Sequence, residues 1–131
     1  MSGVSNLVYE YVLSEENYSE GAMIIEEGSH GDSIYVVLKG QVKIQKKTPK
    51  GTVAIDTLEE GDVFGEMVFL MKEKTRTASV VANGPVLVGI LDSERLAREW
   101  ESVSPHLRRV TTLMAKKLRD ATIKAIALAK G

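Results

Sequence analysis

Residues 34–44 read IYVVLKGQVKI, and this stretch decides the fold class of the chain. Ile34, Val36 and Leu38 occupy alternate positions, and the apolar alternation continues on the far side of Gly40. A period of two residues is that of a β-strand with one buried face. A glycine between two such runs is typical of a tight turn, because it adopts positive φ without steric cost. The stretch therefore predicts two strands joined by a turn.

The same pattern continues outward along the chain. Alternating apolar runs follow Gly51 at 53–57 and follow Gly84 at 86–90, and nine of the eleven glycines lie between Gly21 and Gly89. Short strands that are separated by glycine about every ten residues are typical of a β-sandwich or barrel. No helix-length segment separates these runs, which argues against a parallel α/β architecture.

Both ends of the chain read as helical. At the N-terminus, apolar residues recur at intervals of three and four and predict a short amphipathic helix. Ser93 is expected to cap a helix that runs to about Trp100, and Ser104 followed by Pro105 is a strong signal for the start of another. The N-terminal helix is expected from Val4, Leu7, Val8, Tyr11 and Val12.

The last helix carries an apolar stripe at a spacing of four and three residues. Through such a stripe the helix either pairs with a second helix or packs on its own sheet, and the spacing alone does not favour one of these two interpretations over the other. The stripe consists of Leu107, Thr111, Met114, Leu118, Ala121, Ala125 and Leu128. The basic residues nearby are expected to form a solvated helix face. These are Arg108, Arg109, Lys116, Lys117, Arg119 and Lys124.

Length and composition exclude several classes of protein. A chain of 131 residues holds one domain, and a net charge of −1 gives no overall basic field for nucleic acid. The charge is uneven, since residues 1–92 carry 8 basic and 14 acidic side chains and residues 93–131 carry 9 and 4. The chain has no cysteine, which excludes disulfides and thiolate metal sites and fits a cytoplasmic protein. The two histidines, His30 and His106, are too far apart to suggest a jelly-roll metalloenzyme.

Membrane and secretion signals are also missing from the sequence. The longest apolar run, Pro85–Leu91, is too short to span a bilayer, and the first 13 residues do not read as a signal peptide. We therefore expect no membrane association.

The residues that could form a binding site lie in two segments, GDVFGEMVFLM at 61–71 and TRTASV at 75–80. The chain leaves a strand, turns at Gly65 and starts an apolar helical turn, whose first N–H groups and positive dipole end favour an anion. Arg76 can return a guanidinium to the same place, and Glu66 can accept hydrogen bonds from sugar hydroxyls. Turn, cation and carboxylate together predict a pocket for a phosphorylated sugar. An alternative is that Arg76 and Glu66 form only a structural ion pair with each other.

The same residues resemble the phosphate-binding cassette of the cyclic nucleotide-binding domain family. The resemblance is carried by 65–70 and 76–80 and covers about residues 18–92. It is supported upstream by Gly21, Ile24, Gly28, Gly31, Asp32, Tyr35, Gly40, Gly61 and Asp62. Val68 and Phe69 depart from the family pattern, in which a small residue and a leucine are usual.

The resemblance implies a role for each site residue. Arg76 would bind the exocyclic phosphate, together with the backbone at Met67 and Val68 and the hydroxyl of Thr77. Glu66 would accept the ribose 2′-OH, and Gly65 would let the backbone approach the ligand. Thr122 in the last helix is the candidate contact to the base.

The resemblance also implies the fold, the function and the partners of the chain. It implies a single mainly β domain over residues 1–131. In this domain, an eight-stranded jelly-roll-like β-roll at about 18–92 is preceded by an N-terminal helix and followed by C-terminal helices at about 93–130. It implies a non-catalytic receptor in signal transduction that binds cAMP in preference to cGMP, holds no metal or cofactor, and shifts its C-terminal helix on binding. We expect a homodimer through that helix, an unidentified downstream protein partner, and no direct DNA binding, since no helix-turn-helix follows the roll. The alternative is a β-roll that has lost its ligand and serves only in dimerisation or protein interaction.

Overall fold

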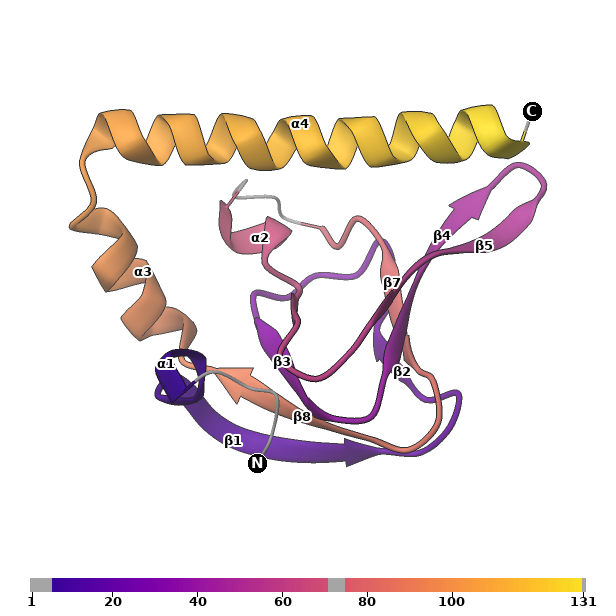
Figure 1. The fold of residues 1–131 in the computed structure, drawn as a ribbon, viewed down its shortest axis with the longest axis horizontal. Coiled ribbons are helices and arrows are strands. Elements are labelled where there is room, and N and C mark those ends of the chain that lie inside the picture. Colours follow the sequence, from indigo (N-terminus) through magenta and orange to yellow (C-terminus); the bar gives the residue numbers. More distant parts are fainter. Residues whose placement is uncertain (1–5, 71–74, 131) are drawn as a thin grey trace.

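The computed structural model describes residues 6–70 and 75–130. In this part of the chain, eight strands form two antiparallel sheets, with a short helix before them and two longer helices after them (Figure 1). This confirms the expected eight-stranded, mainly β fold with helices at both ends. The strands are β1 Val12–Tyr18, β2 Met23–Ile25, β3 Tyr35–Lys39, β4 Val42–Thr48, β5 Gly51–Leu58, β6 Val63–Phe64, β7 Ser79–Ala82 and β8 Val86–Leu91. The helices are α1 Asn6–Tyr9, α2 Met67–Leu70, α3 Ser93–Glu101 and α4 Pro105–Lys130.

The two sheets each contain four strands in an order that mixes near and distant segments of the chain. One sheet has the order β1-β8-β3-β6 and the other β2-β7-β4-β5. The β4–β5 hairpin pairs from Val42 and Leu58 at its base to Thr48 and Gly51 at its tip. The turn at Gly40 carries the chain from the first sheet to the second, as the roll requires.

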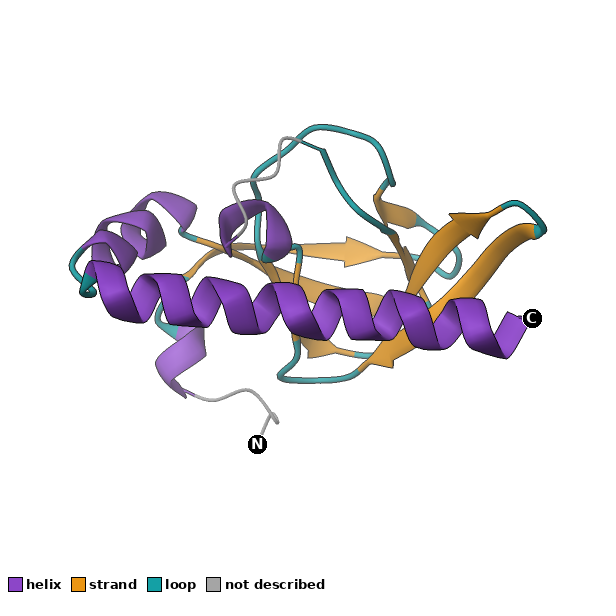
Figure 2. Ribbon diagram, turned by 90° about the horizontal axis from the view of Figure 1, so that it is seen from above, coloured by secondary structure: helices purple, strands orange, loops and turns teal. Residues whose placement is uncertain are grey.

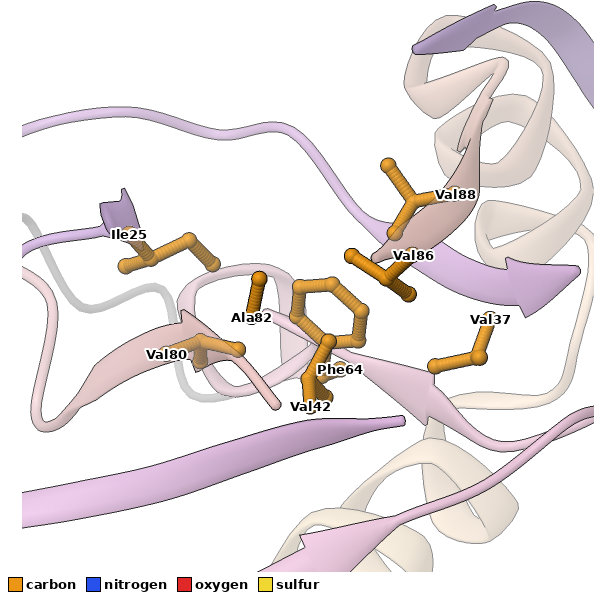
Figure 3. Packing of buried hydrophobic residues seen from close by; sticks show 8 residues of the cluster. All are labelled: Ile25, Val37, Val42, Phe64, Val80, Ala82, Val86 and Val88. Carbon is orange, nitrogen blue, oxygen red and sulfur yellow. The ribbon is translucent and has the colours of Figure 1, made fainter. Parts of the chain in front are cut away.

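The core lies between the sheets and is built mainly from valine and one phenylalanine (Figure 3). Phe64 is 1 % exposed and stacks on Tyr35 at a ring-centroid distance of 5.0 Å. The β-branched residues around it suit strands because they pack well on a pleated surface. The buried members of this cluster are Ile25, Val37, Val42, Phe64, Val80, Ala82, Val86 and Val88.

Strand β3 buries both of its faces, which explains why its sequence is so continuously apolar. Val37 points into the roll, whereas Val36 and Leu38 belong to a second buried cluster on the other face of the sheet. Leu96 of α3 packs against this second cluster. The roll therefore holds α3 through an apolar contact.

The predicted N-terminal helix is wrong over its second half. Helix α1 ends at Tyr9, and Val12 starts β1, paired with Leu91 of β8. Val8, Tyr11 and Val12 still bury against the second cluster, so the apolar spacing reports burial rather than a continuous helix. Pairing with β8 outweighs the local helical pattern, and the strands start earlier than the expected residue 18; Val4 lies outside the described residues.

The C-terminal helices begin nearly as predicted. The cap of α3 is Asp92 rather than Ser93, because the Asp92 carboxylate accepts the N–H of Arg95 at 3.0 Å. Ser104 caps α4 as expected, and its hydroxyl accepts the N–H of Leu107 at 3.2 Å. Aspartate and serine are both strong N-cap residues, so the sequence signal at 92–93 is ambiguous by one position.

Helix α4 runs along one side of the roll, with α2 between them near its first half (Figures 1 and 2). At about 1.5 Å per residue, its 26 residues extend for about 39 Å. Arg108, Thr111, Ala115 and Arg119 are half-buried, so the expectation of a solvated face is wrong for the two arginines. None of the described helices is long and apolar enough to cross a membrane.

Candidate functional site

The site is built on the loop between β6 and β7. After Phe64 the chain turns at Gly65, which has φ of +84° and so favours glycine. One helical turn follows, in which the Glu66 carbonyl accepts the N–H groups of Phe69 and Leu70. The first N–H groups of that turn, at Met67 and Val68, have no partner within the helix. Met71, the last residue of the quoted segment, lies outside the described residues.

Arg76 is the buried cation of the site. It is 6 % exposed, and its guanidinium donates from Nη1 to the Gly65 carbonyl at 3.0 Å and from Nη2 to the Ser33 carbonyl at 2.9 Å. Two glycines make room for it. A Cβ at Gly31 would lie 3.3 Å from Nη2, and one at Gly65 would lie 3.2 Å from Nη1.

The alternative of a structural ion pair between Arg76 and Glu66 does not hold. Among the described residues, no carboxylate lies within ion-pair distance of Arg76. The guanidinium hydrogen-bonds to the neutral carbonyls of Gly65 and Ser33, and a buried charge without a hydrogen-bonded counter-ion is costly in a low-dielectric environment. An anion bound beside the guanidinium would relieve that cost.

Glu66 lies beside the guanidinium without pairing to it. Burial raises the pKa of the Glu66 carboxyl above its usual range, while its own backbone N–H and the charge of Arg76 act in the opposite direction. A hydroxyl that donates to this carboxylate would stabilise its ionised form. Glu66 is therefore suited to accept a hydrogen bond from a neutral donor.

These residues open onto one cavity of about 340 Å³. The volume falls within the range of about 300–1,000 Å³ that is typical of small-molecule sites. All seven residues singled out from the sequence lie on its wall: Gly65, Glu66, Met67, Val68, Arg76, Thr77 and Thr122. Their roles toward a ligand stay predictions.

Helix α4 supplies the outer wall of the cavity. Thr122 is exposed, and its hydroxyl donates to the Leu118 carbonyl at 2.9 Å, so its lone pairs remain able to accept a hydrogen bond. Leu118 and Ala115 contribute apolar surface from the same helix. Ile44 and Ile55 of the β4–β5 hairpin contribute further apolar surface to the wall.

Three charged residues of the wall were missed by the sequence analysis. Lys46 and Asp56 come from β4 and β5, and Arg119 comes from α4. Alternation along β4 places Lys46 on the same face as Ile44, so the strand period is the one signal that could have found it. For Arg119, no signal in the sequence distinguishes the side of α4 that faces the roll.

The short helix α2 also contacts α3. The rings of Phe69 and Trp100 lie 6.2 Å apart at 56°, a tilted aromatic pair. Val68 lines the main cavity and also a second one of about 320 Å³ between α2, α3 and α4. The wall of the main cavity is therefore connected through one helical turn to the C-terminal helices.

A sequence model of the cyclic nucleotide-binding domain matches residues 15–102. The chain belongs to this family. The match spans all eight strands except the first three residues of β1, and it includes α2 and Arg76. No cluster of three or more potential metal-ligating His, Cys, Asp or Glu side chains occurs in the described part of this cyclic nucleotide-binding domain.

Relatives of this cyclic nucleotide-binding domain include kinases and kinase subunits. The chain is 38 % identical over 97 residues to a cAMP-dependent protein kinase regulatory subunit of Aspergillus fumigatus, with 74 % of this chain and 23 % of that protein covered. It is 39 % identical over 77 residues to the cGMP-dependent protein kinase, isozyme 1, of Drosophila melanogaster, with 56 % and 10 % covered. The chain thus spans about a quarter or less of these curated relatives.

Solved structures of nucleotide-bound proteins include the same fold. The EAL enzyme Bd1971 in its cAMP-bound form has a TM-score of 0.77 at 25 % identity, with 87 % of this chain and 30 % of that chain covered. The cGMP-bound form of that enzyme has a TM-score of 0.74 at 26 % identity, with 81 % and 28 % covered.

Proposed function

We propose that this chain is a non-catalytic receptor module that binds a 3′,5′-cyclic nucleotide in the cavity beneath α4. The observation that carries the proposal is the buried guanidinium of Arg76, which faces the cavity without a carboxylate partner among the described residues. A cyclic phosphate carries one negative charge and two exposed oxygens, and the planar fork of arginine matches that geometry. The ribose 2′-OH would then meet Glu66, and the base would extend toward α4.

The proposal favours cAMP over cGMP, although relatives and neighbouring structures are named for both nucleotides. An outward-facing adenine would present its amino group to α4, where the Thr122 hydroxyl, which donates its proton to the Leu118 carbonyl, could accept a hydrogen bond from it. Thr77 is the competing contact, because a hydroxyl beside the phosphate site could meet the amino group of a guanine that folds back over the phosphate. The apolar wall around Leu118 supports the outward arrangement.

Ligand binding would act on the C-terminal helices through α2. The phosphate would contact the backbone at Met67 and Val68, and the next residue, Phe69, packs on Trp100 of α3. A shift of α2 would therefore move α3 and α4, the bistable element that a partner protein could detect. Trp100 is the single tryptophan of the chain, so a change in its fluorescence on nucleotide binding, lost in Phe69→Ala, tests this step.

The exposed stripe of α4 supports a homodimer. Leu107, Met114, Leu118 and Leu128 are 55 %, 61 %, 70 % and 80 % exposed, which is unusual for large apolar side chains that share one helix face. A second copy that pairs through the same stripe would bury them in an isologous contact. A cytoplasmic setting and an unidentified downstream partner complete the proposal, as the sequence predicts.

Thermal unfolding with and without nucleotide tests the binding proposal. A ligand that binds only the folded state, present at about 100 times its Kd, stabilises it by about 2.7 kcal/mol. We expect cAMP to raise the Tm of the wild-type chain, and to raise that of Arg76→Ala much less, because the variant binds the same nucleotide more weakly. If the wild-type chain is folded and neither nucleotide changes its Tm, the result would support the alternative of a β-roll without a ligand.

A further inference from the structure

Lys46 projects from β4 into the wall of the nucleotide cavity and contacts the chain next to Arg76. Its ammonium donates to the Thr77 carbonyl at 2.5 Å and pairs with the Glu27 carboxylate at 3.5 Å. The side chain is only 27 % exposed, so these contacts are shielded from water and stronger than at an open surface.

Glu27 fixes the ammonium in place. One carboxylate oxygen accepts the backbone N–H of Lys47 at 2.9 Å while the other faces Lys46. The backbone N–H of Glu27 in turn donates to the buried hydroxyl of Ser79 at 2.8 Å. Lys46 therefore belongs to a network that joins the segment after β2, strand β4 and the start of β7.

The network fixes one of the two peptide groups that flank Thr77. The peptide group before Thr77 is held because the Arg76 carbonyl accepts the N–H of Gly28 at 2.8 Å. The peptide group after it is held by Lys46 through the Thr77 carbonyl. Since peptide groups are planar, fixing both sets the two backbone dihedrals of Thr77 and hence the direction in which its Cα–Cβ bond points.

We propose that Lys46 is a positioning residue for nucleotide recognition, and that it acts by orienting Thr77 toward the ligand. This inference rests on the proposed cyclic nucleotide binding and adds a residue to it. The Thr77 hydroxyl lies where it can contact the phosphate or the base, so its orientation sets affinity and also the ratio of cAMP to cGMP binding. Loss of the Lys46 ammonium frees the peptide after Thr77 to rotate.

Calorimetric titration of four chains with both nucleotides tests the inference: wild type, Lys46→Met, Thr77→Ala and the double variant. We expect Lys46→Met to weaken cAMP binding by about tenfold and to change the cAMP-to-cGMP ratio. In the Thr77→Ala background the same substitution should cost less than about twofold, because coupled residues are not additive. Lys46→Arg should restore binding, since it keeps a cationic donor.

Lys47→Met is the matched control. Lys47 is the next residue on the same strand, its side chain is exposed and does not line the cavity, and its loss changes the net charge equally. If Lys46→Met does not fold, Lys46→Gln replaces it in the same cycle. Equal effects of Lys46→Met and Lys47→Met, or equal losses in the wild-type and Thr77→Ala backgrounds, would overturn the inference while leaving nucleotide binding intact. A wild-type chain that binds neither nucleotide would overturn the proposed function itself.

Discussion

The guanidinium of Arg76 is packed against the backbone of Gly65 so closely that the two positions depend on each other. Nη1 donates to the Gly65 carbonyl at 3.0 Å, and a Cβ at Gly65 would lie 3.2 Å from the same nitrogen and 2.9 Å from the Ser33 carbonyl. The turn therefore sets the place of the cation, and the cation limits the turn to glycine. This relationship makes the proposed phosphate site depend on the backbone of the turn as well as on its side chains.

Gly65→Ala should reduce both stability and nucleotide affinity by more than the strain of its backbone conformation alone would cause. Gly84 is the matched control, because its φ of +85° equals that of Gly65 within a degree but a Cβ there meets nothing within 4 Å. Both variants should lose about 1–2 kcal/mol of stability from the left-handed backbone. In urea unfolding we expect a larger loss for Gly65→Ala, and in titration an affinity loss of about tenfold or more for that variant alone. Equal stability and equal affinity of the two variants would contradict the packing argument.

The burial of Glu66 makes stability depend on pH in a defined direction. Its pKa is raised in the folded chain, so the folded state binds the proton more tightly than the unfolded state. The resulting stabilisation is complete below the unfolded pKa of about 4.3 and is lost as pH rises through the raised value. Stability curves of the ligand-free chain should show this loss, and Glu66→Gln should lack it. A wild-type curve that matches that of the variant would refute this assignment.

Binding should depend on pH in the opposite sense. The 2′-OH would donate a stronger hydrogen bond to the ionised carboxylate than to the protonated carboxyl group, so affinity for cAMP should fall as pH drops through the raised pKa of Glu66. The 2′-deoxy analogue is the control ligand, because it lacks the donor and leaves a partly buried carboxylate unpaired. It should bind more weakly at neutral pH, with little of this pH dependence. Equal binding of the two ligands at neutral pH would remove Glu66 from ribose recognition.

The exposed stripe of α4 predicts a dimer that a double substitution should dissociate. Leu107→Lys with Met114→Lys places like charges across the proposed seam, and neither residue lines the cavity. Sedimentation should report a dimer for the wild type and a monomer for the double variant, which should still bind nucleotide. Lys116→Glu, on another face of α4, should remain dimeric. A wild-type chain that stays monomeric at high concentration would exclude this interface.

Base recognition should depend on Thr122. One hydrogen bond is worth about 0.5–1.5 kcal/mol, so a preference for cAMP of a few-fold to tenfold is expected. Thr122→Ala should narrow it without changing stability, because the side chain is exposed. Competition of the two nucleotides against a fluorescent analogue measures the ratio. Tighter cGMP binding, with selectivity abolished by Thr77→Ala, would assign the base contact to Thr77.

Local patterns in the sequence predict the strands, and they also predict that Gly65 and Arg76 lie together. The continuous apolar run from Ile34 to Leu38 follows from burial on both sides of β3, and the pairing of Gly65 with Arg76 reflects contacts made within one loop. Residues whose role depends on long-range packing were not predicted. Lys46 enters the site only because β4 lies beside β7, and the turn from α1 into β1 depends on pairing with β8.

The orientation of α4 is the other feature that local pattern could not supply. The stripe from Leu107 to Leu128 predicts a helix face, but the face that packs on the roll is a neighbouring one that includes Ala115 and Arg119. Its members are mixed in polarity, so they carry no periodic signal.

The most direct test of the account is calorimetric titration of the wild-type chain and Arg76→Ala with cAMP, cGMP and 5′-AMP. We predict that the wild type binds one nucleotide per chain, with cAMP up to tenfold tighter than cGMP and 5′-AMP much weaker. Loss of the charged contact should weaken cAMP binding by about 2–4 kcal/mol, or roughly 30- to 1000-fold. Arg98→Ala, which removes an exposed arginine of α3, should bind as the wild type does. A folded Arg76→Ala chain within threefold of wild-type affinity would show that the phosphate does not bind at Arg76, and a folded wild-type chain that binds no cyclic nucleotide would contradict the central claim.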